Sequence, residues 1–554
     1  MHKKSGNGFH RPVQINVRDI AHLLRLLRFV KKEIIISLFC VISLTGLAQI
    51  SPAAVKQFVS FENKIGSAES RRNESIFYEK IGFMTGWIQK ENKTNCIFLL
   101  SVLKQAADWG LQSKDYDIDF IASVLQDKLH LQNQADSIRA DIKITQSAIQ
   151  FYSDITFGNT SPALGYNGIN YVPGCTNIAA LLAESMLKNE LPVLARRLNT
   201  TLPQIQSLTN RIQWYNRVMA DSSFKETAIR SSKVNAANLP LIIKLWQLSL
   251  LDTAKNRLTD SLVKAGVKEA QRQFGLLADG VLRATALAEL NVPLATRLQQ
   301  LNLSVNYYRW LNCLAQSQPV IVVNIPAAYM KVYHKQQVIL EMRMVLGKKS
   351  TPTPTLASRI TELVLYPYWH VPFSIATKEL LPHIKKDPGY LAAGNFQLLN
   401  LSGKIIDPYT VNWQSLSTRY FPYIIRQSTG CDNSLGLIKL NFYSPYSVYL
   451  HDTPVKNAFM LNKRYFSHGC LRMSKPMELA HLLVKNPLTI DTLEEKGCLR
   501  NQSPVMVPAD KQMPVIVWYN PADVDSSGRV LFFEDVYGKF NWTRETPDNN
   551  LAAQ

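Results

Sequence analysis

A short part of the chain near residue 460 combines a thiol, two imidazoles, a hydroxyl and a guanidinium. The side chains concerned are His451, Ser467, His468, Cys470 and Arg472, with Tyr449 and Gly469 beside them. A thiol attacks an acyl carbon only as the thiolate, and an ordinary cysteine with a pKa of about 8.5 is largely protonated at neutral pH. A neighbouring imidazole can take that proton. These residue types therefore indicate nucleophilic catalysis through a cysteine.

Either histidine could be the base that activates Cys470. His451 ends a predicted strand, whereas His468 precedes the cysteine by two positions, and side chains two positions apart share one side of an extended chain. Gly469 allows a tight turn, so we expect the N–H groups around Cys470 to bind an oxyanion. Arg472 can pair with a carboxylate of the substrate. A zinc site is not expected, because a fourth ligand and CxxC pairs are missing.

The elements around these residues follow a strand pattern. Apolar runs separated by short polar turns predict strands at 320–325, 330–333, 338–347, 360–372, 435–442 and 446–451. A helix is predicted at 477–485, with Ser474 at its N-cap and Pro476 in its first turn. Between about 373 and 426 the chain is irregular and rich in Pro, Gly, Tyr and Lys, which indicates an inserted lid or binding loop.

The residues before 319 follow a helical pattern instead. Apolar side chains recur at spacings of three and four through 56–235 and again through 240–312. We expect two helical units whose Trp and Tyr side chains are core residues. A strand-rich region follows them. The predicted fold class is therefore multidomain α+β, and 554 residues suffice for about three or four domains.

The charge is strongly positive, at +20, but part of it is local. Residues 1–33 hold eight basic and two acidic side chains, which gives about +6 there. The remainder is spread thinly, without a basic stripe interleaved with aromatic residues. Nucleic acid is therefore not an expected partner.

An uncharged segment at 34–50 follows this basic arm. It is either an uncleaved membrane anchor, which is the favoured interpretation, or a secretory signal with Gly46 and Ala48 near a cleavage point. Basic residues in front of such a segment keep that end in the cytoplasm. In both interpretations everything after residue 55 is exported.

The pattern of His451, then Ser-His-Gly-Cys at 467–470, then an apolar residue and Arg472, resembles the L,D-transpeptidases with a YkuD-type catalytic domain. The segments VNIPAAYMKVY, PYWHVPFSIATKELLP and SHGCLRMSKPMELAHLL resemble the large YcbB-like branch of that family. In this branch a helical scaffold domain and a peptidoglycan-binding-like domain precede the catalytic domain. The resemblance covers most of 70–540 and is strongest in 319–485.

The resemblance implies a domain order for the whole chain. The expected parts are a basic cytoplasmic arm (1–33), an anchor or signal (34–50), a helical scaffold domain (56–235), a small helical peptidoglycan-binding-like domain (240–312), a mainly β catalytic domain (319–495) with a capping insertion (373–426), and a strand-rich extension with a polar tail (496–554). The protein is expected in the cell envelope, on the periplasmic face, tethered to the inner membrane or secreted.

The resemblance also implies roles for individual residues. Cys470 matches the nucleophile, and His451 matches the base, with the carbonyl of Asp452 expected to orient its ring. The other candidates are expected to shape the thiol's surroundings or to contact substrate and oxyanion: His468, Gly469, Ser467, Arg472 and Tyr449. No cofactor or metal is implied. Cys431 departs from the family pattern, which leaves open a second thiol near the cleft, or a disulfide.

The implied activity is acyl transfer between peptide stems of peptidoglycan. The thiolate would attack a tetrapeptide stem, release its terminal D-residue, and pass the acyl group to an amine of a second stem as a 3→3 cross-link. Two alternatives stay open. One is an L,D-carboxypeptidase that trims tetrapeptide stems with water, and the other is a non-catalytic scaffold protein that binds the wall.

Overall fold

The structure is a computed structural model that describes residues 50–62, 67–129, 131–199, 202–251, 258–486, 488–491, 493–540 and 542. The basic arm predicted at 1–33 and the uncharged segment predicted at 34–50, apart from its last residue, lie outside these ranges. Within them, no helix combines the length and the apolar character needed to cross a bilayer.

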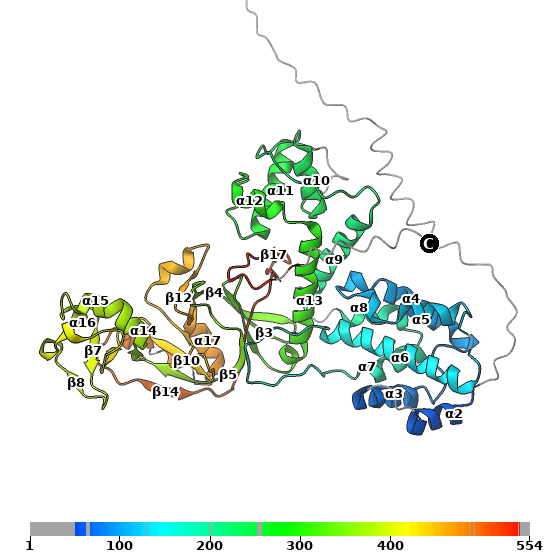
Figure 1. The fold of residues 1–554 in the computed structure, drawn as a ribbon, viewed down its shortest axis with the longest axis horizontal. Helices are drawn as coiled ribbons and strands as arrows, with labels where there is room; N and C mark the ends of the chain where they lie inside the picture. Colours follow the sequence, from blue (N-terminus) through cyan, green and yellow to red (C-terminus); the bar gives the residue numbers. More distant parts are fainter. Residues whose placement is uncertain are drawn as a thin grey trace, which may run out of the picture. The chain divides into compact units, whose positions relative to one another are not determined.

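Helices predominate in the described residues up to 220, as the apolar spacing predicts (Figure 1). They are α2 (Pro52–Gln57), α3 (Ala68–Lys80), α4 (Lys93–Lys104), α5 (Ile118–Leu125), α6 (Gln134–Phe157), α7 (Ile178–Leu187), α8 (Leu191–Leu198) and α9 (Pro203–Ala220). The shorter elements are η1 (Phe58–Glu62), η2 (Lys90–Asn92), η3 (Ala106–Trp109), η4 (Ser113–Asp115) and β1 (Tyr166–Asn167).

A buried carboxylate organises this helical region. Asp141, in the first half of α6, accepts a hydrogen bond from the Tyr78 hydroxyl at 2.7 Å and from the backbone N–H groups of Gly86 and Trp87, each at 2.9 Å. A buried charge is tolerated only when hydrogen bonds replace its water shell. Burial nevertheless raises the pKa of this carboxyl above its ordinary value. Asp141 thus ties α3 and the loop that follows it to α6.

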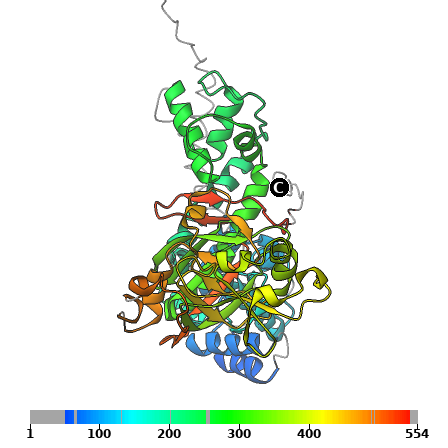
Figure 2. The same cartoon turned by 90° about the vertical axis from the view of Figure 1, so that its left-hand side faces the viewer.

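A second helical unit follows, seen as the green bundle in Figure 2. It contains α10 (Leu239–Gln247), α11 (Asp260–Gln273), α12 (Ala284–Leu290) and the long α13 (Leu294–Ser317). A disulfide joins Cys313 of α13 to Cys175, which lies before α7. Assigning this unit to peptidoglycan binding stays a prediction from the resemblance.

The strand-rich region forms one large sheet. Its strands run in the order β1, β5 (Leu356–Leu365), β10 (Ile438–Phe442), β11 (Leu450–His451), β13 (Leu471–Met473), β4 (Gln337–Gly347), β3 (Tyr329–His334), β2 (Val320–Asn324) and β15 (Pro514–Trp518). Two strands lie off this path: β12 (Tyr465–Ser467) pairs with β4, and β14 (Val505–Pro508) pairs with β5. Because β15 also pairs with β5, the strand order returns to near its start.

The sheet is covered on both faces, which explains its continuous apolar strands. In β2, Val320 and Val322 pack into the core formed with the second helical unit, whereas Ile321 and Val323 pack into the opposite core. Alternate side chains of a strand point to opposite faces, so a strand buried on both sides is apolar throughout. The opposite core includes α17 (Pro476–Leu483).

The predicted catalytic boundary at 495 does not coincide with the edge of the sheet. β15 pairs in parallel with β2 and in antiparallel with β5, well after that residue. The chain leaves the sheet after β13, forms α17, α18 (Leu488–Asp491) and α19 (Leu493–Lys496), and returns to it. After it, β16 (Ala522–Val524) and β17 (Val530–Phe532) form a separate two-stranded sheet.

Three local expectations differ from the structure. The single strand predicted at 360–372 is divided in the structure between the end of β5 and the short β6 (Trp369–His370). Of the strand predicted at 446–451 only β11 forms, because Ser447 has a left-handed φ of 52°. Helix α17 begins at Pro476 as predicted, but its N-cap is Lys475. Ser474 instead donates its backbone N–H to Arg343 of β4, which keeps it at the sheet.

The irregular segment at 373–426 folds around a core of its own. It contains α14 (Phe373–Ile375), η5 (Ala376–Leu380), α15 (Leu381–Ile384), α16 (Tyr390–Ala393), η6 (Pro408–Thr410) and η7 (Trp413–Ser415). Its small sheet runs β6, β9 (Ile424–Gln427), β7 (Phe396–Leu399) and β8 (Ile405–Ile406). This unit, called the insertion below, leaves the large sheet after β5 and rejoins it at β10.

Candidate active site

The register of three strands places the candidate residues on one face of the large sheet. His451 of β11 lies opposite Arg472 of the parallel β13 and opposite Lys439 of the antiparallel β10. Directly paired residues point to the same face, and so do residues two positions apart along an extended chain. Tyr449 and Cys470, which precede His451 and Arg472 by two positions, therefore share this face.

Side-chain contacts agree with the register. The ring centroids of Tyr449 and His451 are 5.7 Å apart, and Lys439 Nζ lies 4.1 Å from the centroid of the Tyr449 ring. The charges of Lys439 and Arg472 both act on the Cys470 thiol. The sulfur is thus surrounded by an aromatic hydroxyl and two cations.

Opposing effects act on the ionisation of Cys470, which is partly exposed. Burial raises the pKa of the Cys470 thiol above its ordinary value. The backbone N–H and hydroxyl of Tyr449, followed by the charges of Lys439 and Arg472, favour the thiolate and oppose this rise. Burial prevails, so the thiol is mostly protonated at neutral pH and needs a base.

The His451 ring is held in the orientation that a base requires. Its Nδ1 lies 2.5 Å from the backbone carbonyl of Asp452, and a carbonyl only accepts hydrogen bonds. Nδ1 therefore carries the proton, and the lone pair is on Nε2, to which no described residue donates. Burial, followed by the charge of Arg472, lowers the pKa of His451 to about 3. The ring is neutral and able to accept a proton at neutral pH.

The Asp452 carbonyl is itself fixed in place. The Asp452 carboxylate pairs with Lys456 and accepts the backbone N–H of Leu437 at 3.0 Å, while its own N–H donates to Ile438 at 2.9 Å. These bonds hold Asp452 against the start of β10. Because they fix the Asp452 carbonyl, they also help to keep the His451 ring in its orientation, as residues around a reactive side chain commonly do.

The second histidine has a different environment. His468 is exposed, and its Nε2 lies 2.7 Å from Glu379 Oε1 of η5. The carboxylate comes from the insertion, so this contact joins the insertion to the motif. Of the two histidines left open by the sequence, His451 has the unpaired ring nitrogen on the face shared with Cys470. We therefore propose His451 as the base.

The turn before the cysteine depends on Gly469. Its φ of 111° lies in a region that side chains disfavour, and its carbonyl accepts the Thr353 hydroxyl at 2.9 Å. The Ser467 hydroxyl donates to the Cys470 carbonyl at 2.7 Å and accepts the Gly469 N–H at 3.2 Å. The N–H of Gly469 is therefore already engaged. In the described part of the chain nothing accepts the Cys470 N–H, which makes it the better candidate for an oxyanion donor.

Two family models match parts of the chain. A family model described as the L,D-transpeptidase catalytic domain, YkuD, matches residues 318–507. Residues 318–507 are a YkuD-type L,D-transpeptidase domain. A second model, described as the scaffold domain, matches residues 75–211. The chain thus has the architecture of the YcbB-like branch, a helical scaffold domain followed by a mainly β L,D-transpeptidase domain.

The chain is also similar to individual proteins described as L,D-transpeptidases. An L,D-transpeptidase candidate from Haemophilus influenzae is 34% identical over 218 residues, which is 39% of this chain and 44% of the relative. The chain thus matches less than half of that relative's length. An L,D-transpeptidase from Mycobacterium smegmatis is 14% identical over 36% of this chain and 58% of its own, with a TM-score of 0.18. The L,D-transpeptidase LdtMt1 in complex with imipenem is 14% identical over the same shares, with a TM-score of 0.17. At these TM-scores the two structures add nothing to the family match.

Arg472 of the L,D-transpeptidase domain is available to a ligand. No described residue forms a hydrogen bond with its guanidinium, and its Nε is buried without a partner. Burial lowers the pKa of Arg472, and the Cys470 thiolate raises it. A guanidinium without a partner, close to the thiol, can bind a carboxylate.

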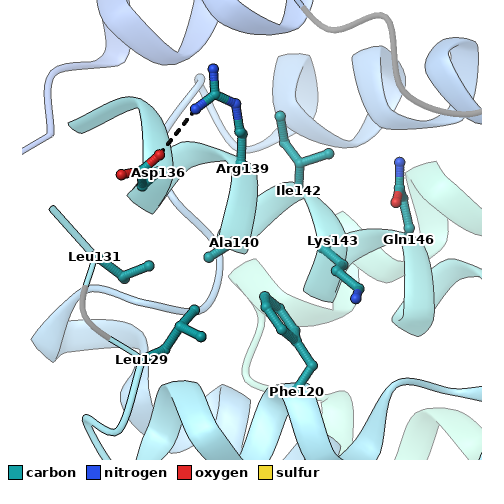
Figure 3. Close-up of a pocket in the computed structure, with 9 residues that line it drawn as sticks. All are labelled: Phe120, Leu129, Leu131, Asp136, Arg139, Ala140, Ile142, Lys143 and Gln146. Atoms are coloured by element: carbon teal, nitrogen blue, oxygen red, sulfur yellow. Dashed lines mark hydrogen bonds and ion pairs between the residues drawn. The ribbon is translucent and has the colours of Figure 1, made fainter. Parts of the chain in front are cut away.

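Two of the hollows among the described residues have linings that do not include the thiol. One of about 510 Å³ lies between α5 and α6 of the scaffold domain, and in Figure 3 its Arg139 is paired with Asp136. Lys143 in the same hollow lies over Phe120. The other hollow, of about 530 Å³, has Asp452 among its lining residues. Neither is lined by Cys470, so the site rests on strand register and contacts. No group of three or more His, Cys, Asp and Glu side chains suited to a metal occurs among the described residues.

Two residues of this environment were missed by the sequence analysis. Lys439 is the single charge in the otherwise apolar run LGLIKL, and such a lysine in a mostly buried strand is a signal in itself. Its neighbours could not be known without the register of β10 and β11. Glu379 lies in the insertion, and no sequence pattern connects it to His468.

Proposed function

We propose that this chain is a peptidoglycan L,D-transpeptidase that forms 3→3 cross-links through an acyl-enzyme on Cys470. The observation that supports the proposal most is the strand register. His451 pairs with Lys439 and with Arg472, and Tyr449 and Cys470 precede His451 and Arg472 by two positions. The family match supplies the reaction class, and the resemblance supplies the peptide stems as donor and acceptor.

In the first half-reaction the Cys470 sulfur attacks the carbonyl of the third residue of a tetrapeptide stem. Its proton passes to His451 Nε2, and the negative charge that develops on the carbonyl oxygen is bound by the Cys470 N–H. The tetrahedral intermediate expels the terminal D-residue, whose nitrogen takes the proton from His451. A thioester to the shortened stem remains.

In the second half-reaction an amine of a neighbouring stem attacks the thioester. His451 removes a proton from the attacking nitrogen and returns it to the departing Cys470 sulfur, so the enzyme is restored. The cleaved peptide bond supplies the acyl group, and no nucleotide is consumed. Water in place of the amine would give a carboxypeptidase from the same residues.

The cations have a separate task in this proposal. The leaving D-residue carries a free carboxylate, and the Arg472 guanidinium has no partner of its own. Arg472 would bind that carboxylate, whereas Lys439 would stabilise the Cys470 thiolate. An exported protein is consistent with the Cys175–Cys313 disulfide, because such bonds persist in oxidising compartments. We therefore place the enzyme in the cell envelope.

The full chain incubated with purified tetrapeptide muropeptides tests this function. Mass spectrometry should detect dimers that have lost one D-residue per cross-link. Shortened monomers without dimers would instead identify a carboxypeptidase. Unchanged muropeptides, with the chain folded, would contradict both and leave a wall-binding scaffold protein.

The pH dependence of the acylation rate should reflect the ionisation of the Cys470 thiol and not that of His451. Because the pKa of His451 is lowered to about 3, its ring stays neutral from pH 4 upward, and no step in rate is expected near pH 6.5. The pKa of Cys470 is raised, so the rate should climb through the alkaline range as the thiol ionises. Stopped-flow acylation by a carbapenem between pH 5 and 10 measures this profile. An inflection near pH 6.5 would show that the imidazole titrates there.

Lys439→Met should slow acylation by roughly 10-fold, which corresponds to about 1.4 kcal/mol of lost thiolate stabilisation. The substitution keeps the length of the side chain and removes the charge that acts on Cys470. Alkylation by iodoacetamide at a series of pH values should show the pKa of Cys470 rising further. Lys404→Met, in an exposed turn of the insertion, is the matched control. Equal acylation rates for the two variants would show that the charge of Lys439 does not contribute to the reactivity of Cys470.

A further inference from the structure

Two cysteines outside the site lie against each other. Cys431 is in the connection between β9 and β10, and Cys498 follows α19 by two positions. Both side chains are exposed and unbonded in the structure. The hydrogen bond of the Cys498 thiol with Cys431 raises the pKa of Cys498. Thiols in such contact need only small movements to form a bond.

Several hydrogen bonds hold the two cysteine segments together on both sides of the thiols. The Ser428 hydroxyl donates to Asn501 Oδ1 at 3.1 Å, and the backbone N–H of Gln502 donates to the Thr429 hydroxyl at 2.9 Å. The Arg500 guanidinium pairs with Asp432 at 3.1 Å. Residues 496–502, called the clasp below, are therefore fixed along the connection that contains Cys431.

The clasp also binds the other connection of the insertion. The chain enters the insertion through 366–368 and leaves it through 428–437. The Tyr368 hydroxyl donates to the Gln502 carbonyl at 3.0 Å, while Asn433 Nδ2 donates to the Pro367 carbonyl at 3.1 Å. Both connections between the insertion and the large sheet are thus held at the clasp. The insertion in turn contacts the catalytic motif through Glu379 and His468.

We propose that Cys431 and Cys498 form a second disulfide, which links the clasp covalently to the connection at 428–437. The oxidant is a disulfide of the surrounding compartment, either a small molecule such as oxidised glutathione or a thiol oxidoreductase. One thiolate attacks that disulfide and releases one thiol from it. The second cysteine then displaces the other thiol, so two cysteines are oxidised and one disulfide is reduced to two thiols.

The other cysteines of the described chain cannot take this role. Cys175 and Cys313 already form a disulfide, and Cys96 is fully buried in the helical region. Cys470 lies on the sheet face with His451 and is held there by its own turn. The bond is independent of the chemistry at Cys470, so failure of the proposed function would leave this proposal standing.

Peptide mapping without reduction tests whether the bond forms. The full chain is treated with oxidised glutathione, its remaining thiols are alkylated, and it is digested. A linked pair of peptides containing Cys431 and Cys498 is expected, and it should be absent from a Cys498→Ser variant. If each cysteine carries glutathione or the alkylating group instead, the proposal is wrong. Linkage of either one to Cys470 would also overturn it.

Hydrogen exchange tests whether the disulfide restrains the two segments that it joins. In the oxidised protein the amides of 428–433 and 498–502 should exchange about tenfold more slowly than in the reduced protein, because local opening then requires both segments to move together. The same comparison in Cys431→Ser should show no change with oxidant. Peptides from α10 and α11 serve as the internal reference. If the Cys431–Cys498 disulfide forms but the exchange rates of these amides do not change, the disulfide does not restrain the two segments.

Discussion

Cys470→Ala is expected to abolish formation of cross-linked dimers, with a loss of roughly 10⁴-fold or more, since removal of a nucleophile leaves only residual binding effects. The side chain is partly exposed and small, so the fold should survive the change. Muropeptide products resolved by chromatography and mass spectrometry measure the loss, and circular dichroism verifies folding.

The matched control for this prediction is another cysteine of the same domain. Cys431→Ala, assayed under reducing conditions, should keep normal dimer formation because Cys431 is an exposed residue of the connection between β9 and β10 and has no part in the proposed reaction. Full activity in Cys470→Ala would show that Cys470 is not the nucleophile. Loss of activity in both variants would instead point to a general requirement for thiols.

His451→Gln is expected to slow acylation by about 10² to 10⁴-fold, the usual contribution of a general base. Glutamine fills a similar volume and can still donate to the Asp452 carbonyl, so the strand pairing around it should persist. It offers no basic nitrogen to the Cys470 sulfur. Single-turnover acylation by a carbapenem, followed by stopped-flow absorbance, measures the rate directly.

His468→Gln provides the comparison, because its imidazole is exposed and paired with Glu379. This variant should acylate much faster than His451→Gln, with any loss arising from the contact between motif and insertion. The opposite order, with His468→Gln the slower of the two, would mean that the base has been assigned to the wrong histidine.

The candidate site was partly visible in the sequence because its chemistry is local. His451, Ser467, Gly469, Cys470 and Arg472 are close along the chain, so residue types and spacing alone could indicate a thiol with a base. The turn at Gly469 also followed from its residue type. The engagement of its N–H by Ser467 depends on side-chain positions that spacing does not define.

The remaining features depend on long-range pairing. Lys439 reaches the site only through the register of β10 and β11, and Glu379 only through the fold of the insertion. The partner of Cys175 is separated from it by 138 residues. A single sequence has no signal for such pairs. For the same reason the strand β15 (Pro514–Trp518) was separated from the sheet to which it belongs.

The helical and strand-rich regions were easier to predict, because periodicity reflects burial. Spacings of three and four predicted the helices before residue 318, and continuous apolar runs predicted β2 and β4. Errors occurred at element ends. There, a left-handed Ser447 or a backbone hydrogen bond from Ser474 outweighs the intrinsic preference of the residues.

The central claim is that the sulfur of Cys470 becomes the acyl carrier, and covalent labelling tests it most directly. The full chain is incubated with a carbapenem, weighed intact, digested and mapped. One adduct per chain is predicted, located on the peptide that contains Cys470 and lost in Cys470→Ala. An unmodified Cys470, or an adduct confined to Cys431 or Cys498, would contradict the account.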